Sequence, residues 1–306
     1  MQRFFLLLTL ALTLSAYSQE YKVETGALKV HEEFDFDAIS PRKVLVWMPE
    51  GYSAKNTYPV LYMHDGQMLF DADQTWNKQA WELDRIIPKL KQQFIVVGIE
   101  SNSERQANYL PQKPFEMLSE KTRDSLYNLK SGKNYLMPDK VNSDDYLLFI
   151  VKRVKPFIDK NYATKPGREH TFIGGASMGA LISLYALCEY PEVFGTALGL
   201  SMPWHGVGDA ANNPYEKALM RYLDKNLPKR GKHRFYVDRG NQGMDIEFAW
   251  GQQKADALFK RKKYKSPHYI SAVFNAEHNE HSWQTRFGSI LEWAVTGKPI
   301  PRFNAR

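Results

Sequence analysis

A glycine-rich stretch near the middle of the chain carries residue types suited to nucleophilic catalysis. Residues 171–180 read as a short apolar strand, a sharp turn and a helix that begins near Met178. Ser177 lies two residues after Gly175 and two before Gly179, so the turn lacks the side chains that would collide in a tight strand-to-helix connection. The Met178 N–H, at a helix N-terminus, would favour a developing negative charge. The stretch predicts an activated serine, with an ordinary glycine-rich turn of a parallel sheet as the alternative.

A serine nucleophile needs a general base, and the base needs a carboxylate that orients it. Residues 175–179 match G-x-S-x-G, which resembles the nucleophile elbow of α/β-hydrolases, where the acid and then the histidine follow at the ends of later strands. The loop after the predicted strand at 234–238 offers Asp245, just before a predicted helix. Asp238, at the strand end, is the alternative, and Glu247 is a more distant one. Either aspartate could instead have a purely structural role, as a helix cap or in closing the turn.

The base should leave the last predicted strand, at 268–275. His278 follows that strand directly, whereas His281 is placed to lie on the first turn of the closing helix. A single histidine is more often structural than catalytic. His278 arrives at the third expected strand end, after a serine and an aspartate, and is therefore predicted to be the base.

Four segments resemble the esterase D-like "putative esterase" family. They are residues 58–67, the elbow, the loop 238–245, and His278 followed by Trp283. Relatives in that family include feruloyl and acetyl xylan esterases, S-formylglutathione hydrolases, enterochelin esterases and the antigen 85 mycolyltransferases. The resemblance implies Ser177 as nucleophile, His278 as base and Asp245 as acid. Asn241 stands where the family's aspartate loop more often has threonine.

The resemblance and the predicted topology also suggest an oxyanion hole and a substrate pocket. Met178 would supply one backbone N–H, and Gly66 or Gln67, in the loop after the strand at 58–63, would supply the second. Six further side chains are predicted to lie at the substrate site. His64 and Asp65 would shape the loop, Arg105 and Tyr109 would contact the substrate, and Trp204 and His205 would line its pocket, with packing under the insertion as the alternative for the last two.

Strand and helix patterns alternate along the chain and predict an α/β-hydrolase fold, a mostly parallel sheet covered by helices on both faces. The patterns predict strands at 21–34, 44–48, 58–63, 94–99, 169–173, 194–201, 234–238 and 268–275. They predict helices at 79–89, 146–159, 178–189, 214–224, 246–262 and 283–293. Residues 101–145 are polar and contain three prolines, which predicts an irregular insertion facing the substrate or covering it, with a surface loop of no functional role as the alternative.

The ends and the composition constrain the compartment. Residues 1–18 combine Arg3, an apolar run and small residues before Gln19, the pattern of a secretory signal peptide. We therefore expect an exported protein, periplasmic or secreted, with one domain over 19–306 and no stable membrane anchor. Cys188 is the only cysteine, so no intrachain disulfide can form. The net charge of +7 is spread along the chain and predicts a solvated face, with no nucleic-acid partner.

Together these features predict a serine hydrolase that cleaves carboxylic esters through an acyl-enzyme, without a cofactor or metal. An acyl group on carbohydrate is the first substrate hypothesis. A siderophore lactone, acyl transfer to a sugar, and a non-catalytic binding protein on the same fold are the alternatives. A metal hydrolase built on His278, Glu280 and His281 is disfavoured, because their spacing matches no H-E-x-x-H pattern.

Overall fold

The computed structural model describes residues 21–137, 139–211 and 213–298. The predicted signal peptide lies outside these residues. No helix within them is long and apolar enough to cross a membrane.

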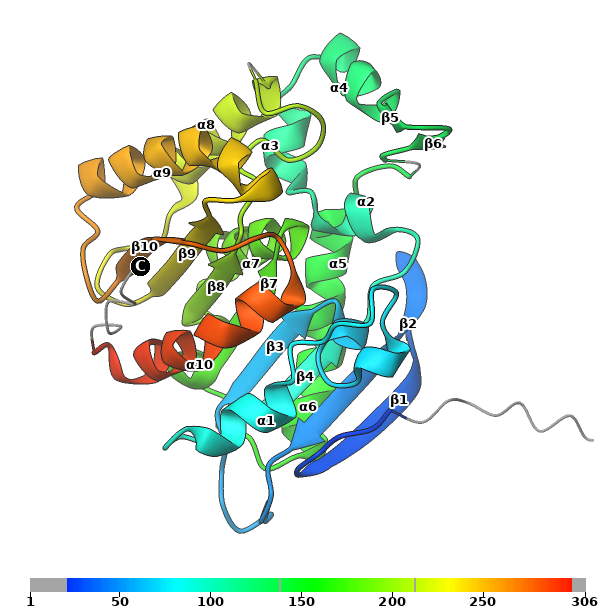
Figure 1. The fold of residues 1–306 in the computed structure, drawn as a ribbon, viewed down its shortest axis with the longest axis vertical. Coiled ribbons are helices and arrows are strands. Elements are labelled where there is room, and N and C mark those ends of the chain that lie inside the picture. Colours follow the sequence, from blue (N-terminus) through cyan, green and yellow to red (C-terminus); the bar gives the residue numbers. More distant parts are fainter. Residues whose placement is uncertain (1–20, 138, 212, 299–306) are drawn as a thin grey trace, which may run out of the picture.

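An eight-stranded sheet runs through the molecule (Figure 1). Its strands, in spatial order, are β1 (Ala27–Phe36), β2 (Ile39–Met48), β4 (Ile95–Ile99), β3 (Val60–His64), β7 (Thr171–Ala176), β8 (Thr196–Leu200), β9 (Arg234–Gly240) and β10 (Tyr269–Phe274). From β4 to β10 all neighbours pair in parallel, whereas β2 is antiparallel to both β1 and β4. Every residue of β3, β4, β7 and β8 is buried, as expected of apolar strands covered on both faces.

Helices cover the sheet on both sides, and the sheet separates the core into two layers. On one face lie the short α1 (Leu83–Ile86) and the closing helix α10 (Glu280–Thr296). On the other lie α5 (Ser143–Phe149) with α6 (Lys155–Asn161), α7 (Met178–Glu189), α8 (Pro214–Asn226) and α9 (Ala249–Arg261). A π-helical turn at Ile150–Val154 joins α5 to α6. Side chains of β3 alternate between the layers, Val60 and Tyr62 in one and Leu61 and Met63 in the other.

Two sequence predictions about elements are wrong. The helix expected over 79–89 is reduced to α1 and a 3₁₀ turn at Ile87–Lys89, because Glu82 takes a left-handed backbone and Pro88 interrupts the pattern. The insertion expected to be irregular contains α2 (Arg105–Tyr109), α3 (Gln112–Glu116), α4 (Glu120–Tyr127) and the small hairpin of β5 (Lys130–Ser131) and β6 (Asn134–Tyr135). These pieces are too short to show a helical period in the sequence. In Figure 1, α4 and the hairpin project at the top.

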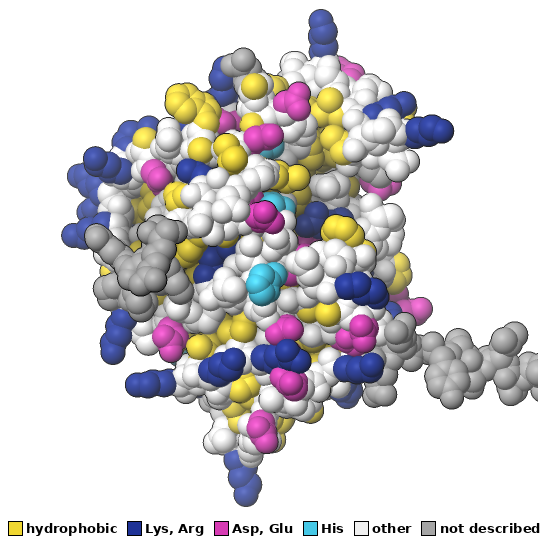
Figure 2. Space-filling view, viewed as in Figure 1, with side chains coloured by type: hydrophobic (Ala, Val, Ile, Leu, Met, Phe, Trp, Pro, Cys, Tyr) yellow, Lys and Arg dark blue, Asp and Glu magenta, His cyan; other side chains and the backbone are white. Residues whose placement is uncertain are grey.

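The basic excess is dispersed over the visible surface. Figure 2 shows Lys and Arg side chains scattered around the edge of this face and interspersed with Asp and Glu. No single large basic patch is visible on the side drawn.

Candidate active site

Ser177 occupies a strained turn between β7 and α7. Its backbone has φ 55° and ψ −128°, a conformation that a non-glycine residue adopts at a cost of about 1–3 kcal/mol. The amide of Ser177 donates to the Leu200 carbonyl on β8 at 2.9 Å, which ties the turn to the sheet. A Cβ on Gly175 would lie 3.1 Å from the backbone of Gly179, so both glycines allow the strand and the helix to meet.

The imidazole of His278 is hydrogen-bonded to a buried carboxylate. Its Nδ1 lies 2.5 Å from Oδ1 of Asp245, which is fully buried in the 3₁₀ turn Gly243–Phe248 after β9. The second carboxylate oxygen accepts from Ser201 Oγ at 2.6 Å and from the Gly240 amide at 2.5 Å. Burial would raise the pKa of Asp245, but the hydrogen bonds from His278, Ser201 and Gly240 outweigh it and lower that pKa. Asp245 is therefore held as a carboxylate against the histidine ring.

Asp238 has other partners. Its carboxylate accepts two hydrogen bonds from Arg286, at 2.8 and 2.9 Å, and one from the Tyr236 hydroxyl at 2.8 Å. Glu247 and His281 are exposed to solvent. Among the alternatives that the sequence left open, the geometry therefore favours Asp245 and His278.

Ser201 is a residue that the sequence analysis missed. It has φ 46°, its hydroxyl donates to Asp245, and the same oxygen accepts from Trp283 Nε1 at 2.8 Å. Its amide donates to Asp238 Oδ1 at 2.9 Å. Ser201 thus connects the two buried aspartates. Its position directly after β8, at the edge where the other site residues gather, is the signal that could have found it.

The loop after β3 is held from three sides. Asp65 has a left-handed backbone, φ 56°, and its carboxylate receives a bidentate pair from Arg105 at 2.7 and 2.9 Å. The Asp65 amide donates to the Tyr109 hydroxyl at 3.1 Å. Gln67 exchanges two hydrogen bonds with Ser101, at 2.6 and 3.0 Å. Burial would raise the pKa of Asp65, but the Arg105 guanidinium outweighs it and keeps that pKa below its ordinary value.

Two backbone amides near Ser177 remain unpaired. Within the described residues, the N–H groups of Gln67 and Met178 have no hydrogen-bond acceptor. Gly66 packs so closely on β4 that a Cβ there would lie 2.7 Å from the backbone of Gly98. That approach brings the loop against the sheet beside the elbow, since β3 and β7 are neighbours.

A cleft of about 550 Å³ opens over these residues. Of the predicted site residues, Ser177, His278, His64, Asp65, Gln67 and Arg105 line it. Ten more residues complete the lining: Met68, Trp76, Asn77, Gln79, Trp81, Ser101, Ala176, Asn279, Glu280 and Trp283. Ser177 and His278 share this lining, although the structure has no hydrogen bond between them; such bonds often tighten only when substrate is bound.

The prediction that Trp204, His205 and Tyr109 line the substrate site is wrong. All three are buried and absent from the cleft lining. The chain after β8 turns into the core, where Trp204 packs so tightly on α9 that a Cβ on Gly251 would lie 2.4 Å from it. His205 packs on Phe248, and the ring of Phe248 in turn lies edge-on to the His278 ring, with centroids 5.7 Å apart.

Comparison with known families is consistent with this geometry. A family model described as "Putative esterase" matches residues 39–294. The chain belongs to this esterase family. It is a carboxylic ester hydrolase with the α/β-hydrolase fold.

Among curated proteins, the esterase is 28% identical to the uncharacterized protein YbbA of Bacillus subtilis over 260 residues. This match covers 82% of this chain and 92% of YbbA. Among solved structures it resembles an IroE-like serine hydrolase from Shewanella oneidensis, with a TM-score of 0.63, 19% identity and coverage of 88% of this chain and 79% of that one. It also resembles enterochelin esterase from Shigella flexneri, with a TM-score of 0.61, 15% identity and coverage of 90% and 59%. A ferulic acid esterase is similar as well, with a TM-score of 0.60, 14% identity and coverage of 90% of this chain and 99% of that one. At these identities the structures establish a common fold.

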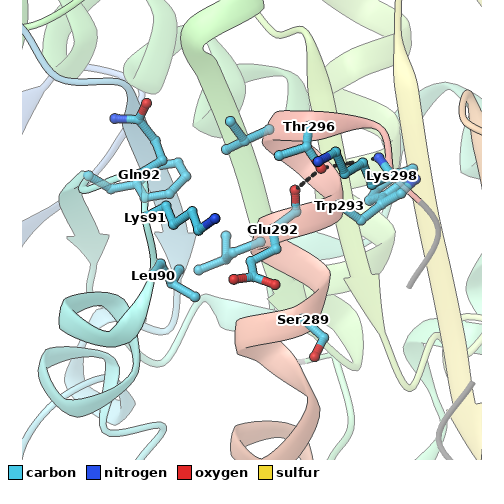
Figure 3. A pocket seen from close by; sticks show the side chains of 11 residues that line it. Leu90, Lys91, Gln92, Ser289, Glu292, Trp293, Thr296 and Lys298 are labelled. Carbon is cyan, nitrogen blue, oxygen red and sulfur yellow. Dashed lines mark hydrogen bonds between the residues drawn. The ribbon is translucent and has the colours of Figure 1, made fainter. Parts of the chain in front are cut away.

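A second pocket of the esterase, about 270 Å³, lies away from Ser177 (Figure 3). Leu90, Lys91 and Gln92 approach it from one side and Glu292, Trp293 and Thr296 of α10 from the other. Its described lining contains no histidine, cysteine or aspartate.

The residues of the disfavoured metal alternative do not converge. Glu280 accepts a hydrogen bond from Asn77 Nδ2 at 2.7 Å, and His281 is exposed. In the described part of the chain, no group of three His, Cys, Asp or Glu side chains is placed to hold a metal ion.

Proposed function

We propose that the esterase works through an acyl-enzyme on Ser177, with His278 as general base and Asp245 as the orienting acid. The observation that carries the proposal is the 2.5 Å contact between His278 Nδ1 and the carboxylate of the buried Asp245. The same histidine lines a cleft together with Ser177, which lies on a strained turn. A carboxylate bound to Nδ1 fixes the tautomer whose Nε2 can take a proton.

The reaction follows from these roles. His278 Nε2 takes the Ser177 proton as the hydroxyl oxygen attacks the ester carbonyl. The N–H groups of Met178 and Gln67 bind the resulting oxyanion, and the protonated His278 gives its proton to the departing alcohol. Water, deprotonated by the same histidine, then attacks the acyl-enzyme; the acid leaves and the Ser177 hydroxyl is restored.

An ester attached to a carbohydrate, met outside the cytoplasm, is the substrate we propose. The amino-terminal signal pattern supports the compartment. Three tryptophans and several amide side chains in the cleft support an uncharged, hydroxyl-bearing ligand: Trp76, Trp81, Trp283, Asn77, Gln79 and Asn279. Arg105 is the only cation among the described lining residues other than histidine, and it is paired with Asp65. This argues against a polyanionic iron–siderophore complex.

The first test compares the mature protein with Ser177→Ala on p-nitrophenyl acetate and butyrate. The mutation should lower kcat by about three orders of magnitude or more, since it removes the nucleophile. Ser125→Ala, which changes an exposed serine on α4, should retain wild-type kcat. Equal activity of wild type and Ser177→Ala would overturn the assignment of the nucleophile.

A product assay separates hydrolysis from acyl transfer. With an acetylated oligosaccharide as donor and an unacylated sugar as acceptor, hydrolysis yields free acetate in the same amount as deacylated donor. Acetyl groups recovered on the acceptor would show transfer instead.

A further inference from the structure

We propose that Trp76 is a stacking platform that holds a sugar ring of the substrate at the mouth of the cleft. The inference rests on the proposed ester hydrolysis and names the part of the cleft that selects the substrate. The predicted triad and oxyanion hole do not include this residue.

Trp76 is exposed to an unusual degree. Its relative exposure is 86%, the largest among the exposed large apolar side chains of the described residues, and yet it lines the same cleft as Ser177. A solvent-exposed indole next to a reaction centre loses hydration favourably when a ligand with a flat apolar face covers it. A cleft of about 550 Å³ also has room for more than a short acyl group.

The backbone that carries Trp76 is anchored on both sides. Thr75 is buried and its hydroxyl donates to the Ala72 carbonyl at 2.8 Å. Asn77 donates to Glu280 at the start of α10 at 2.7 Å, and its Oδ1 accepts from the Gln79 amide at 3.1 Å. The ring is therefore presented by a segment that is already ordered, which reduces the entropy lost on binding.

Two further tryptophan rings, both largely buried, form part of the cleft wall beside the base. Trp81 packs on Trp283 with ring centroids 5.5 Å apart, and Trp283 lies edge-on to His278 at 5.1 Å. All of these rings line the cleft. A ligand that rests on Trp76 can thus extend along one wall to the reacting groups.

The polar groups beside this wall identify the ligand as a sugar. Asn77, Gln79 and Glu280 offer amide and carboxylate groups at the edge of the platform, where ring hydroxyls would lie. A pyranose ring presents C–H groups on its face and hydroxyls on its rim, and so matches an indole surrounded by such groups. A planar aromatic acid would use the indole but would present no ring hydroxyls to these polar groups.

The test compares Trp76→Ala with Trp250→Ala, a matched control because Trp250 is 63% exposed on α9 and does not line the cleft. kcat/KM is measured for an acetylated xylo-oligosaccharide, for methyl ferulate and for ethyl acetate, which has no ring. For Trp76→Ala, the ratio of the oligosaccharide value to the ethyl acetate value should fall about tenfold, mainly through KM. Trp76→Phe should recover part of the loss, and Trp250→Ala should leave the ratio unchanged.

A binding measurement keeps this inference separate from the catalytic proposal. Unacylated xylotriose is titrated into the Ser177→Ala protein, with and without Trp76→Ala, by calorimetry. Binding that weakens about tenfold in the double variant would support the platform even if no ester were hydrolysed. An unchanged ratio together with unchanged xylotriose binding would overturn it. A loss confined to methyl ferulate would also overturn the sugar assignment in favour of an aromatic acid.

Discussion

At the scale of single residues, the site depends on which carboxylate contacts His278. Asp245 and Asp238 are both buried on or just after β9, but only Asp245 bonds to the histidine, while Asp238 is paired with Arg286. Ser201 bonds to both aspartates and so holds them apart in fixed orientations. Neutralising Asp245 should therefore affect mainly catalysis, whereas neutralising Asp238 should affect mainly stability.

Replacing Asp245 by Asn should lower kcat by about 10⁴ with little loss of stability. The amide can still approach Nδ1, but it no longer stabilises the imidazolium and favours the wrong tautomer. Steady-state kinetics on p-nitrophenyl acetate checks the size of the effect. A kcat close to that of the wild type would remove Asp245 from the proposed triad.

Asp238→Asn is the matched comparison. It leaves the guanidinium of Arg286, only 2% exposed, without a counter-charge, and should lower the free energy of unfolding by about 3–5 kcal/mol. Urea denaturation measures this loss. A fully stable Asp238→Asn protein with a 10⁴-fold lower kcat would instead make Asp238 the acid.

The predicted residues that the structure places at the cleft are mostly those whose positions follow from the ends of strands. Ser177 and His278 both line the cleft, with Asp245 behind the histidine, because parallel strands deliver their carboxyl ends to one edge of the sheet. Trp204 and His205 also follow a strand, but the chain then turns inward, and no sequence pattern shows the direction of such a turn. Trp76 was missed for the opposite reason, because an isolated tryptophan in a loop is usually assumed to pack.

At the scale of elements, the segment after β4 braces the loop after β3. Arg105 and Tyr109 of α2 hold Asp65, and Ser101 holds Gln67. The sequence predicted a lid or substrate-facing insertion in this region, because polar residues and prolines follow a strand end. The first part of the insertion supports the proposed oxyanion loop, and its short helices could not be recognised because each spans only one or two turns.

Arg105→Gln should lower kcat by about 10- to 100-fold and change KM little, since it releases the strained Asp65 and loosens the adjacent Gln67 amide. The loss should stay below the roughly 10²–10³-fold cost of removing an oxyanion donor altogether. Steady-state kinetics on p-nitrophenyl butyrate separates kcat from KM. Arg105→Lys should fall in between, because lysine keeps the charge without the bidentate fork.

Arg85→Gln serves as the control, since Arg85 is half-exposed on α1 and pairs with Glu24 and Glu82 away from the cleft lining. It should leave kcat unchanged. If Arg105→Gln raised KM and left kcat unchanged, Arg105 would be a substrate contact, and its ion pair with Asp65 would not be needed to position the loop after β3.

At the scale of the whole molecule, the sheet order determines where the site can form. From β3 the chain crosses to β4 on one side and later to β7 on the other, so the loops after β3 and β7 flank the point where the winding reverses. The alternation of apolar runs and helices predicted this architecture. What it could not predict is the cost of the buried polar groups that the site places next to the core.

His64 is the clearest case of such a cost. It is 2% exposed at the end of β3, its Nδ1 lies 2.7 Å from the Tyr146 hydroxyl, and its Nε2 has no partner among the described residues. Burial lowers its pKa to about 3, with Asp65 opposing this and Arg105 adding to it. The unfolded chain binds a proton here below about pH 6.5, whereas the folded protein stays unprotonated until about pH 3.

This difference predicts how stability depends on pH. Because the unfolded state binds the extra proton, stability falls as the pH drops from about 6.5 toward 3, by up to about 1.4 kcal/mol per pH unit from His64 alone. Between pH 7 and pH 5, where carboxylates contribute little, His64→Gln should remove about 2 kcal/mol of the loss seen in the wild type. Urea unfolding at the two pH values measures it, with His170→Gln, at a partly exposed histidine, as the control. If wild type and His64→Gln lost the same free energy, His64 would have to be protonated in the folded protein, and its buried, neutral state would be wrong.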